Sequence, residues 1–460
     1  MKALRYRLRL VQPLLVAQIH AGEENSAVGM SYIPGSTLRG AIVGHYVREE
    51  NPDDLAFANT ERALFLDGTV AFLNAYPYGN GTRMLPRPRS WLTEKDLAAD
   101  RGAVLYDFAV QINTPLEQPK APKSAAFCVI APAEPPEAAW EVLPSPEVAL
   151  YTPPRQINVH ISLEKPNTRT DENAVYRYDA IAEGEVFEGA IVASDDFDLA
   201  PLQALLVPGE ALFLGGAHTA GYGRALIEDV VLDFGWEEYE PAEAIEGKVV
   251  LTLLSDLILR GDAGQVDADL DAALSHLLGF KVTAQQRFQQ LQLVGGFNRK
   301  WGLPLVQDWA LGAGSVYVYA DVRIDPEALQ TLLAPGIGER RAEGFGRVAV
   351  NWHTAPQFKR IALSAPVNLA PRLSSESQTL AARMAQRRLQ TELEQGLVTF
   401  LSRVRIDRPP QNPQLARVRN VMQQVLLGVQ ANNLDAVVQH LDNLKAVSYT
   451  HLTLPTKRIV

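Results

Sequence analysis

The sequence predicts an α+β protein with two related sheet-containing domains followed by a small helical domain. Apolar and basic residues alternate at the start of the chain, KALRYRLRL, with the period of a half-exposed β-strand. A Gly-aromatic-Gly-Arg sequence followed by alternating apolar residues occurs twice, and each copy comes after a strand-like run that begins with Lys. We therefore predict domains over residues 1–238 and 246–353, joined by a Pro/Glu/Ala linker over residues 237–246.

The apolar spacing changes to that of a helix after Ser374, where leucine and methionine residues recur at helical intervals and PPQNP separates two runs. This pattern predicts a helical C-terminal domain over residues 370–446. The final residues, VSYTHLTLPTKRIV, follow none of the earlier patterns, and residues 447–456 can be back-translated to a transposon-type sequencing adaptor read in frame. We expect residues 447–460 to be a non-native tail.

Composition restricts the classes of protein that fit. The 460 residues are 47% hydrophobic and 21% charged, which excludes disordered and fibrous classes. The single cysteine, Cys128, excludes a disulfide framework and a Cys-based zinc site, and a lone Cys is most often a small buried hydrophobe. No signal peptide or membrane span is apparent, so we expect a cytoplasmic protein. The net charge of -10 argues against indiscriminate binding of polyanions, so nucleic-acid binding requires local basic clusters.

The first helix is predicted at YIPGSTLRGAIVGHYV, where a Pro-Gly pair makes a turn and Ser36 or Thr37 caps the helix. Arg39 lies just inside this helix. The helix dipole, the free N–H groups and a guanidinium therefore converge on one place that suits a phosphate. A solvated Arg on a surface helix is the alternative.

Strand-like runs follow at residues 70–75 and 128–131, and the polar residues 164–173 read as the tip of a long hairpin. Between these runs, RMLPRPRSW places three arginines without an acid beside Trp91, a side chain that can stack on a base. The predicted RNA contacts of this run are Arg83, Arg87 and Arg89. A solvated edge loop is the alternative.

The segment GGAHTAGYGR contains four glycines, so its backbone can approach a ligand closely and its amides can point at phosphate oxygens. Its predicted RNA contacts are Gly215, Gly216, His218, Gly221, Tyr222, Gly223 and Arg224. A tight turn without a ligand is the alternative. No GK[ST] follows and the loop runs into a strand, which excludes a P-loop and a dinucleotide fingerprint.

Two further basic segments lie in the second predicted domain. GERRAEGFGR repeats the Gly-rich pattern and adds Arg340, Arg341 and Arg347. NRKWGLP places Arg299 and Lys300 beside a Trp, although Trp301 is more often a core or turn anchor than a base platform. We include all five basic residues among the predicted RNA contacts.

The sequence offers little evidence for a catalytic site. None of the eight histidines has a metal-ligand spacing, no GxSxG occurs, and the carboxylates Asp256, Glu339 and Glu343 lack the pairing of a two-metal site. The sequence therefore predicts no metal, no cofactor and no catalytic residue. His20 and His218 are the candidates for a general base in RNA cleavage, against a structural or phosphate-contacting role.

Four motifs in order, YIPGSTLRGA, FLNAYP with RMLPRPRSW, GGAHTAGYGR and VGGFNRKWGLPLVQ, resemble the RAMP superfamily of CRISPR effector subunits. Within it they look most like the type III, subtype D family called Csx ten. The likeness covers roughly residues 1–352. It implies tandem ferredoxin-like (RRM-like) domains with a Gly-rich loop at the end of the sheet, in a complex of antiviral defence.

The resemblance also implies partners. These are the guide RNA, whose repeat-derived 5′ handle the subunit would hold, the target RNA paired with it, the large polymerase/nuclease-like effector subunit and the backbone RAMP subunits. Gly35, Ser36 and Arg39 match the helix-start motif, and residues 164–173 resemble the protruding thumb that intercalates between guide and target.

Backbone subunits of this superfamily carry a target-cleaving Asp before the PGS motif, but SAVGMSYIPGS has none. This absence favours a non-catalytic RNA-binding subunit. Guide-processing members use a general-base His, so a metal-independent repeat endoribonuclease using His20 or His218 stays the alternative. In a third interpretation the sheet domains are only scaffold, and a basic face of the C-terminal helix (Arg383, Arg387, Arg388) binds the RNA.

Overall fold

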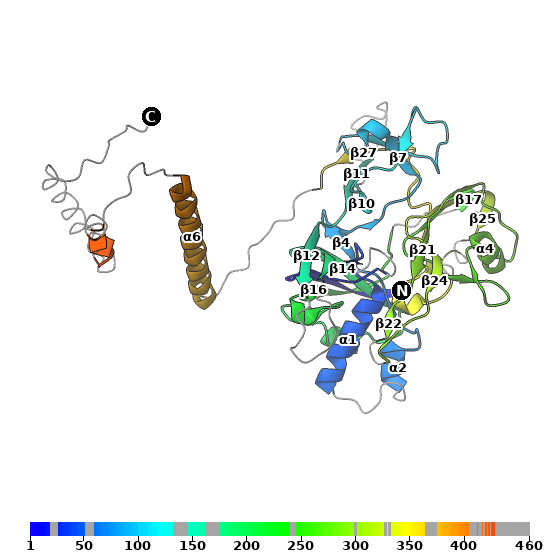
Figure 1. The fold of residues 1–460 in the computed structure, drawn as a ribbon. Helices are drawn as coiled ribbons and strands as arrows, with labels where there is room; N and C mark the ends of the chain where they lie inside the picture. Colours follow the sequence, from blue (N-terminus) through cyan, green and yellow to red (C-terminus); the bar gives the residue numbers. More distant parts are fainter. Residues whose placement is uncertain are drawn as a thin grey trace, which may run out of the picture. The chain divides into compact units, whose positions relative to one another are not determined.

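The protein is described by a computed structural model (Figure 1). The described residues are 1–18, 26–50, 59–100, 102–131, 146–161, 175–239, 245–298, 301–325, 329, 333–363, 375–403 and, as separate helical positions, 412, 416, 419, 420, 422, 423 and 425–427. The chain divides into two units, Met1–Val367 and Asn368–Val460. Across the described residues, no helix combines the length and the apolar character needed to cross a membrane.

The first sheet is built around the N-terminal strand. β1 (Lys2–Leu10) pairs antiparallel with β14 (Val186–Ala193) on one side and with β16 (Arg224–Phe234) on the other. The strand order is β15-β16-β1-β14-β4-β5, and β3 also pairs with β14. The remaining strands are β15 (Ala211–Phe213), β4 (Tyr76–Gly79), β5 (Thr82–Arg83) and β3 (Ala71–Phe72).

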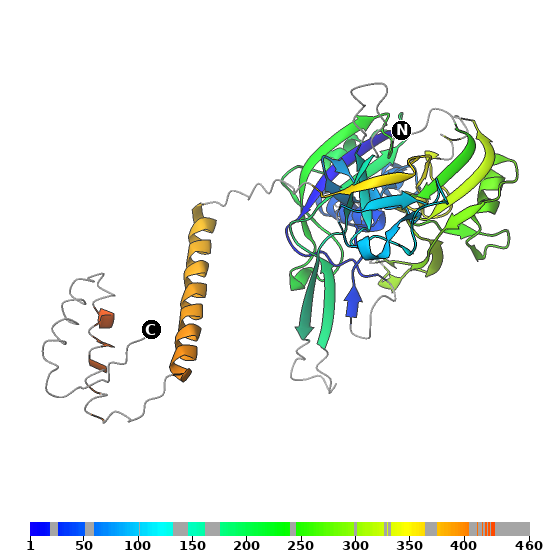
Figure 2. The ribbon, with the colours of Figure 1, turned by 90° about the horizontal axis from the view of Figure 1, so that it is seen from above.

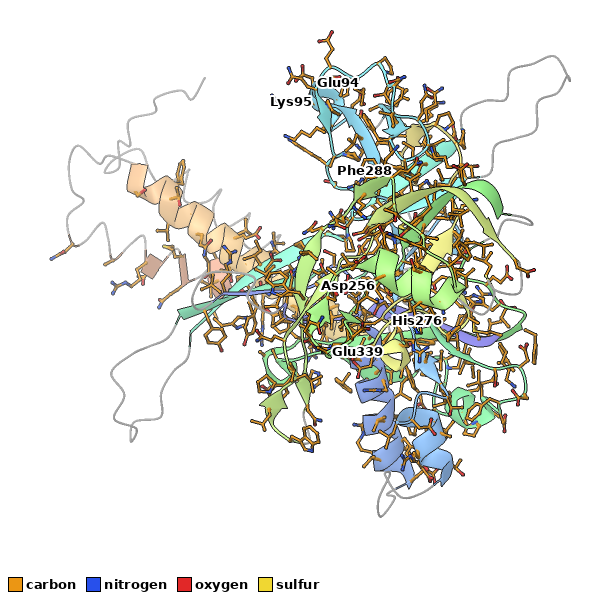
Figure 3. The ribbon with its side chains drawn as sticks, turned by 90° about the vertical axis from the view of Figure 1, so that its right-hand side faces the viewer. Glu94, Lys95, Asp256, His276, Phe288 and Glu339 are labelled. Carbon is orange, nitrogen blue, oxygen red and sulfur yellow. The ribbon has the colours of Figure 1, made fainter. Side chains whose placement is uncertain are left out.

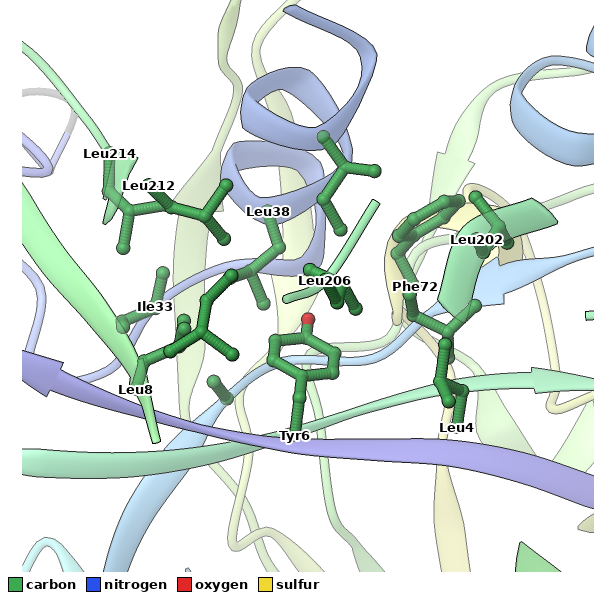
Figure 4. Packing of buried hydrophobic residues seen from close by; sticks show 14 of the residues in the cluster. Leu4, Tyr6, Leu8, Ile33, Leu38, Phe72, Leu202, Leu206, Leu212 and Leu214 are labelled. Atoms are coloured by element: carbon green, nitrogen blue, oxygen red, sulfur yellow. The ribbon is translucent and has the colours of Figure 1, made fainter. Parts of the chain in front are cut away.

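One face of this sheet makes the main core. Leu4, Tyr6 and Leu8 of β1 are fully buried, and Leu38 of α1 (Gly35–Glu50) packs in the same cluster (Figure 4). Further members come from around α2 (Asn59–Phe65) and α3 (Ala200–Ala204). Each large apolar side chain buried here contributes about 1.5–3 kcal/mol. The alternating strand and the first helix predicted from the sequence are confirmed, although the helix begins at Gly35, so the predicted caps Ser36 and Thr37 lie inside it.

The opposite face of the first sheet carries a ladder of ion pairs. Arg5 lies between Glu188 of β14 (3.4 Å) and Asp233 of β16 (3.2 Å). Arg7 pairs with Asp229, and Arg9 Nε lies 2.5 Å from Glu228 Oε1. The three arginines of β1 are thus neutralised by carboxylates of the two strands beside it.

The second sheet has the strand order β20-β25-β17-β26. Its strands are β17 (Ile245–Leu253), β20 (Gln286–Phe288), β25 (Val316–Ile324) and β26 (Val348–Val350). α4 (Leu270–Leu278) is capped by Asp269 and packs Leu270 and Leu274 into a second core. In both sheets the opening strand lies beside the strand that follows a Gly-rich segment: β1 lies between β14 and β16, and β17 lies between β25 and β26.

A third sheet was not expected from the sequence. Its order is β6-β10-β11-β27-β8-β7-β9, and Trp91, Cys128 and Phe358 pack in its core. Its strands are β6 (Leu85–Pro86), β7 (Trp91–Glu94), β8 (Val104–Asp107), β9 (Pro119–Lys120), β10 (Phe127–Ala131), β11 (Glu147–Tyr151) and β27 (Gln357–Ile361). β27 follows the second sheet in the chain, yet it pairs with β11 and β8. The boundaries 1–238 and 246–353 stay predictions.

Smaller elements complete this unit. β12 (Arg155–Ile161) and β13 (Val175–Ile181) form a hairpin that projects from the sheets, and β2 (Ser26–Val28) pairs with β13 (Figure 2). The predicted hairpin tip, residues 164–173, lies outside the described residues. The other pairs are β18 (Leu259–Arg260) with β19 (Val266–Asp267), β21 (Leu291–Val294) with β24 (Asp308–Leu311), and β22 (Phe297–Asn298) with β23 (Leu303–Pro304). Short 3-10 helices are η1 (Lys95–Leu97), η2 (His218–Ala220) and η3 (Arg341–Glu343).

The second unit contains α6 (Ser375–Arg403), which confirms the helical spacing read in that stretch. Its large apolar side chains are exposed, among them Leu380, Met384 and Leu393. A complete helical domain over residues 370–446 stays a prediction, and residues 447–460 lie outside the described part of the chain.

Candidate nucleic-acid interface

The first Gly-rich segment, residues 215–224, joins β15 to β16 through η2. Gly215 and Gly223 have φ of 67° and 88°, and a Cβ at these positions would lie 2.3 Å from the Leu15 carbonyl oxygen and 2.1 Å from that of Leu214. The turn therefore requires glycine at both. Gly216 and Gly221 are exposed, and a Cβ on either would meet nothing within 4 Å. The outer part of the turn is therefore open to solvent, although the Gly216 and Gly221 amides donate to the Leu15 and His218 carbonyl oxygens (both 3.1 Å).

Two polar side chains of this segment have different surroundings. Arg224 is exposed, and no ion pair of its guanidinium is found within the described ranges. His218 is half-buried, and its Nε2 lies 3.1 Å from the Leu214 carbonyl oxygen. Arg224 is therefore free to meet a phosphate, whereas one ring nitrogen of His218 is held by the turn itself.

Tyr222 connects the segment to the β12–β13 hairpin. Its ring is buried, and its hydroxyl accepts a hydrogen bond from Asn158 Nδ2 (2.8 Å) and lies 2.9 Å from His160 Nε2. The His160 ring stacks on Tyr176, with centroids 5.5 Å apart and planes at 15°, and lies 4.8 Å from the Tyr178 ring. The half-buried rings of these three residues form a surface continuous with the Gly-rich segment.

This aromatic face corrects one expectation from the sequence. Tyr222 was predicted to contact RNA, but its ring is only 2% exposed and its hydroxyl contacts Asn158 and His160 instead. Asn158, His160, Tyr176 and Tyr178 were not singled out, although their alternation in QINVH and VYRYD is the signal of side chains that share one sheet face.

The second Gly-rich segment, residues 338–347, repeats the backbone of the first. Ala217 and Arg340 both open a 3-10 turn with left-handed φ of 57° and 54°, and Gly221 and Gly344 both close it with φ of 83°. A Cβ at Gly338 would lie 2.2 Å from the Ile258 carbonyl oxygen, much as at Gly215. The repeat read from the sequence is therefore a repeat of structure.

The surroundings of the two copies differ. A Cβ on Gly344 would lie 2.8 Å from the Phe72 carbonyl oxygen, and one on Gly35 would lie 1.9 Å from that same oxygen and 2.5 Å from that of Glu343. The Gly35 N–H donates to Asn74 Oδ1 (3.0 Å). The start of α1, including half-buried Ser36, was expected to bind a phosphate, but it packs on β3 and on the second Gly-rich segment.

Glu343 fixes this contact by charge. Its Oε1 lies 2.5 Å from Arg39 Nη2, and its Oε2 accepts from Arg340 Nε (2.9 Å). Arg340 also donates to the Gly295 carbonyl (2.9 Å) and lies over the Phe345 ring, 4.5 Å from its centroid. Arg39 and Arg340 were predicted as phosphate contacts, but both are engaged by the protein.

Arg83 and Arg347 meet at one buried carboxylate. Arg83 Nη1 lies 2.7 Å and Arg347 Nε 2.9 Å from the carboxylate oxygens of Glu238, whose side chain is 2% exposed. Burial acts to raise the pKa of Glu238, but the two guanidiniums outweigh it and hold that pKa below its ordinary value. Both arginines were predicted to contact RNA, and the structure places both in the interior.

The run RMLPRPRSW also lies inside the protein. Arg87 donates to the carbonyls of Ala125 (2.9 Å), Pro88 (2.7 Å) and Trp91 (3.0 Å), and burial lowers the pKa of Arg87 to about 10. Burial likewise lowers the pKa of half-buried Arg89. Trp91 is fully buried and donates to Asp107 (3.2 Å), so it is not a platform for a base. Backbone carbonyls thus satisfy Arg87 in place of an acid.

The remaining expectations fall in three places. Arg341 is exposed beside a cleft of about 760 Å³ between the α2–β3 turn and residues 334–347. Arg299, Lys300 and His20 lie outside the described residues. Asp256 is buried, whereas Glu339 is exposed and pairs with Arg260. Figure 3 shows both carboxylates far from Glu94 at the end of β7 and Lys95 at the start of η1. Among the residues described, no group of three His, Cys, Asp or Glu side chains is placed to hold a metal ion.

Comparison with solved structures gives distant similarities. A type III-B Cmr-beta complex bound to cognate target RNA and AMPPnP contains a chain 14% identical, with TM-score 0.37, covering 69% of this chain and 86% of that one. A CRISPR associated protein Cas6 is 9% identical, with TM-score 0.31, covering 76% and 98%. A structure described as a RAMP protein binding different RNA substrates is 10% identical, with TM-score 0.30, covering 76% and 99%.

No curated protein sequence matches the chain. The family comparison does give a match. It begins within β1, includes the helix-start motif and the hairpin, and ends just after the first Gly-rich segment. This part of the chain, residues 7–226, matches the model of the RAMP superfamily.

Proposed function

We propose that the protein is a non-catalytic RNA-binding subunit of a type III CRISPR interference complex, and that it holds the repeat-derived 5′ handle of the guide RNA in antiviral defence. The observation that carries the proposal is the exposed first Gly-rich segment, joined through Tyr222 to an aromatic hairpin face inside the region matched to the RAMP superfamily. One of the similar solved structures is a Cmr complex bound to target RNA, and another is a RAMP protein that binds RNA.

The chemistry of this surface suits single-stranded RNA. The guanidinium of exposed Arg224 reaches phosphate oxygens without sequence preference, and the exposed Gly216 and Gly221 leave room for the RNA backbone beside it. The rings of His160, Tyr176 and Tyr178 suit an unstacked base, since aromatic side chains stack on any base. We assign phosphate contact to the first segment and base contact to the hairpin.

The outer face of the first sheet is excluded from this role. RRM domains bind RNA on such a face through exposed aromatic residues. Here the face carries Arg5, Arg7 and Arg9, each already paired with a carboxylate. RNA therefore binds at the end of the sheet and on the hairpin.

The finer assignments belong to the same proposal. Both sheets place their opening strand between the third and the last strand of a β-α-β-β-α-β order, which supports tandem ferredoxin-like domains. The proposal also places the protein in the subtype D, Csx ten family and gives it a helical C-terminal domain. Its proposed partners are the large effector subunit, the backbone RAMP subunits and the target RNA.

Replacing one exposed arginine tests the RNA surface. Arg224→Ala is expected to weaken binding of a guide RNA with its 5′ handle and to lower the slope of log affinity against log salt by about 0.7. The control is Arg388→Ala, which removes another exposed arginine, one that lies 3.1 Å from Glu392, from α6. Loss of affinity in Arg388→Ala with none in Arg224→Ala would move the RNA to the C-terminal helix.

The endoribonuclease alternative has a separate test. Repeat RNA incubated with the protein in EDTA is expected to stay full-length. Cleavage that disappears in His20→Ala or His218→Ala would replace the proposed role by a metal-independent nuclease.

A further inference from the structure

The outer edge of the first sheet is open over most of β16. β1 pairs with β16 from Ala225 to Phe234, whereas β15 pairs only with residues 224–226. Beyond the Gly209–Ile227 contact, no described strand lies along residues 228–234 on the side away from β1. Val231 and Phe234 are 41% and 69% exposed there. Such an edge presents unpaired backbone donors and acceptors to another strand.

The charges of the sheet alternate from strand to strand up to this edge. β14 contributes Glu188, β1 contributes arginines and β16 contributes acids, so Arg5 has a carboxylate on each side. Asp229 and Asp233 each contact one arginine, and their side chains remain 42% and 37% exposed. A strand placed beside β16 would complete the alternation with basic residues, since opposite charges stabilise cross-strand neighbours.

Two other occupants fit this edge poorly. A second copy of the chain, paired antiparallel about Val231, would set each Asp229 opposite an Asp233, and like charges across strands are destabilising. An RNA strand would meet carboxylates in place of cations. Asp229 and Asp233 therefore disfavour both a second copy of the chain and an RNA strand at this edge.

We propose that residues 228–234 accept an extended segment of a partner protein that carries Lys or Arg at alternate positions and adds a strand to the first sheet. Backbone hydrogen bonds supply the affinity of such strand addition, and Asp229 and Asp233 supply its preference for basic residues. At a rise of about 3.3 Å per residue, Val231 lies about 23 Å along the strand from Arg224. The partner strand and the RNA thus use different parts of β16.

Hydrogen exchange on the full chain tests the proposal. The probe is a short blocked peptide that alternates Lys and Val, compared with one that alternates Glu and Val and with a Lys-Val peptide interrupted by Pro. The saturating Lys-Val peptide is expected to slow amide exchange in residues 228–234 about tenfold. The other two peptides are expected to change it little, because one repels the acids and the other cannot complete the ladder.

Variants tie the effect to the acids. Asp229→Asn with Asp233→Asn is expected to remove the preference for the Lys-Val peptide, while Glu49→Gln with Glu50→Gln, which removes two exposed acids from α1, keeps it. Equal protection by both charged peptides, no protection, or concentration-dependent protection without peptide would each overturn the proposal, the last in favour of self-association. The effect of Arg224→Ala on RNA affinity is measured in a separate experiment, so a failure of the strand-addition proposal does not affect the test of RNA binding.

Discussion

The two Gly-rich segments have the same backbone and opposite surroundings. Residues 215–224 expose Gly216 and Gly221, whereas residues 338–347 are packed against β3 and the start of α1. The glycines recur because the turn needs them in both places. Binding capacity does not recur with them, since it depends on what covers the turn. A Gly-rich motif is therefore evidence for a turn first and for a ligand only where the turn is open.

The last residue of each segment shows the same contrast. Arg224 and Arg347 both follow a Gly with positive φ and lead into the closing strand. Arg224 is exposed, while Arg347 is buried on Glu238 and also donates to the carbonyls of Leu333 and Ala334 (both 2.9 Å). The motif places both arginines at the same position of the turn, but the surrounding fold leaves Arg224 exposed and buries Arg347.

Removing these two arginines is expected to give the largest difference. Arg347→Ala leaves Glu238 with one cation in the interior and is expected to lower the free energy of unfolding by about 3–5 kcal/mol. Arg224→Ala is expected to change it by less than about 0.5 kcal/mol. Urea unfolding of both variants measures this, and equal losses would contradict the contrast.

Adding one methyl group to each turn is expected to give the next largest effect. Gly344→Ala and Gly221→Ala start from the same φ of 83°, so both incur about 1–2 kcal/mol of backbone strain. Only Gly344→Ala also meets the Phe72 carbonyl oxygen, for about 1–3 kcal/mol more. Equal unfolding free energies for the two variants would show that the second turn is not tightly packed.

Lowering the pH is expected to destabilise the second Gly-rich segment before the first. Because the pKa of Glu238 is lowered in the folded state, its contribution to stability is complete above its ordinary value of 4.5 and is lost as the pH falls below that value. Glu238→Gln is expected to be less stable near neutral pH but to lose less stability on acidification. Thermal unfolding from pH 6 to pH 3 measures both, and parallel pH profiles would argue against the role of this carboxylate.

The smallest expected effect concerns the aromatic hairpin. Tyr222→Phe removes the hydroxyl that contacts Asn158 and His160 and is expected to cost about 1 kcal/mol of stability. It is also expected to weaken RNA binding, because His160 loses an orienting partner. Unchanged RNA affinity at unchanged stability would remove Tyr222 from the interface.

Local patterns made the opening strand, the first helix and the repeat predictable. The period of two placed Leu4, Tyr6 and Leu8 in the core, and the predicted first helix adds Leu38 and Ile42 to the same cluster. The glycine pattern indicated the shared turn. Each of these features depends on residues close together in the sequence.

Whether each arginine is exposed or buried was not predictable from local sequence. Arg83 is neutralised by Glu238, and Arg39 by Glu343, through pairs distant along the chain. The run around Arg87 looked free because no acid is nearby, yet backbone carbonyls satisfy it. Exposure of a basic residue is decided by tertiary packing, which a charge count does not contain.

The position of β27 has a consequence for synthesis of the chain. This strand comes after the whole second sheet, yet it lies between β11 and β8 in the third sheet. On the ribosome, residues 85–151 must therefore wait with an open gap in their sheet until residues 357–361 emerge. We expect chains ended at residue 353 to be cleaved rapidly by protease within residues 85–151, and chains ended at residue 367 to resist it. A part of this protein that is translated early is thus among the last to finish folding.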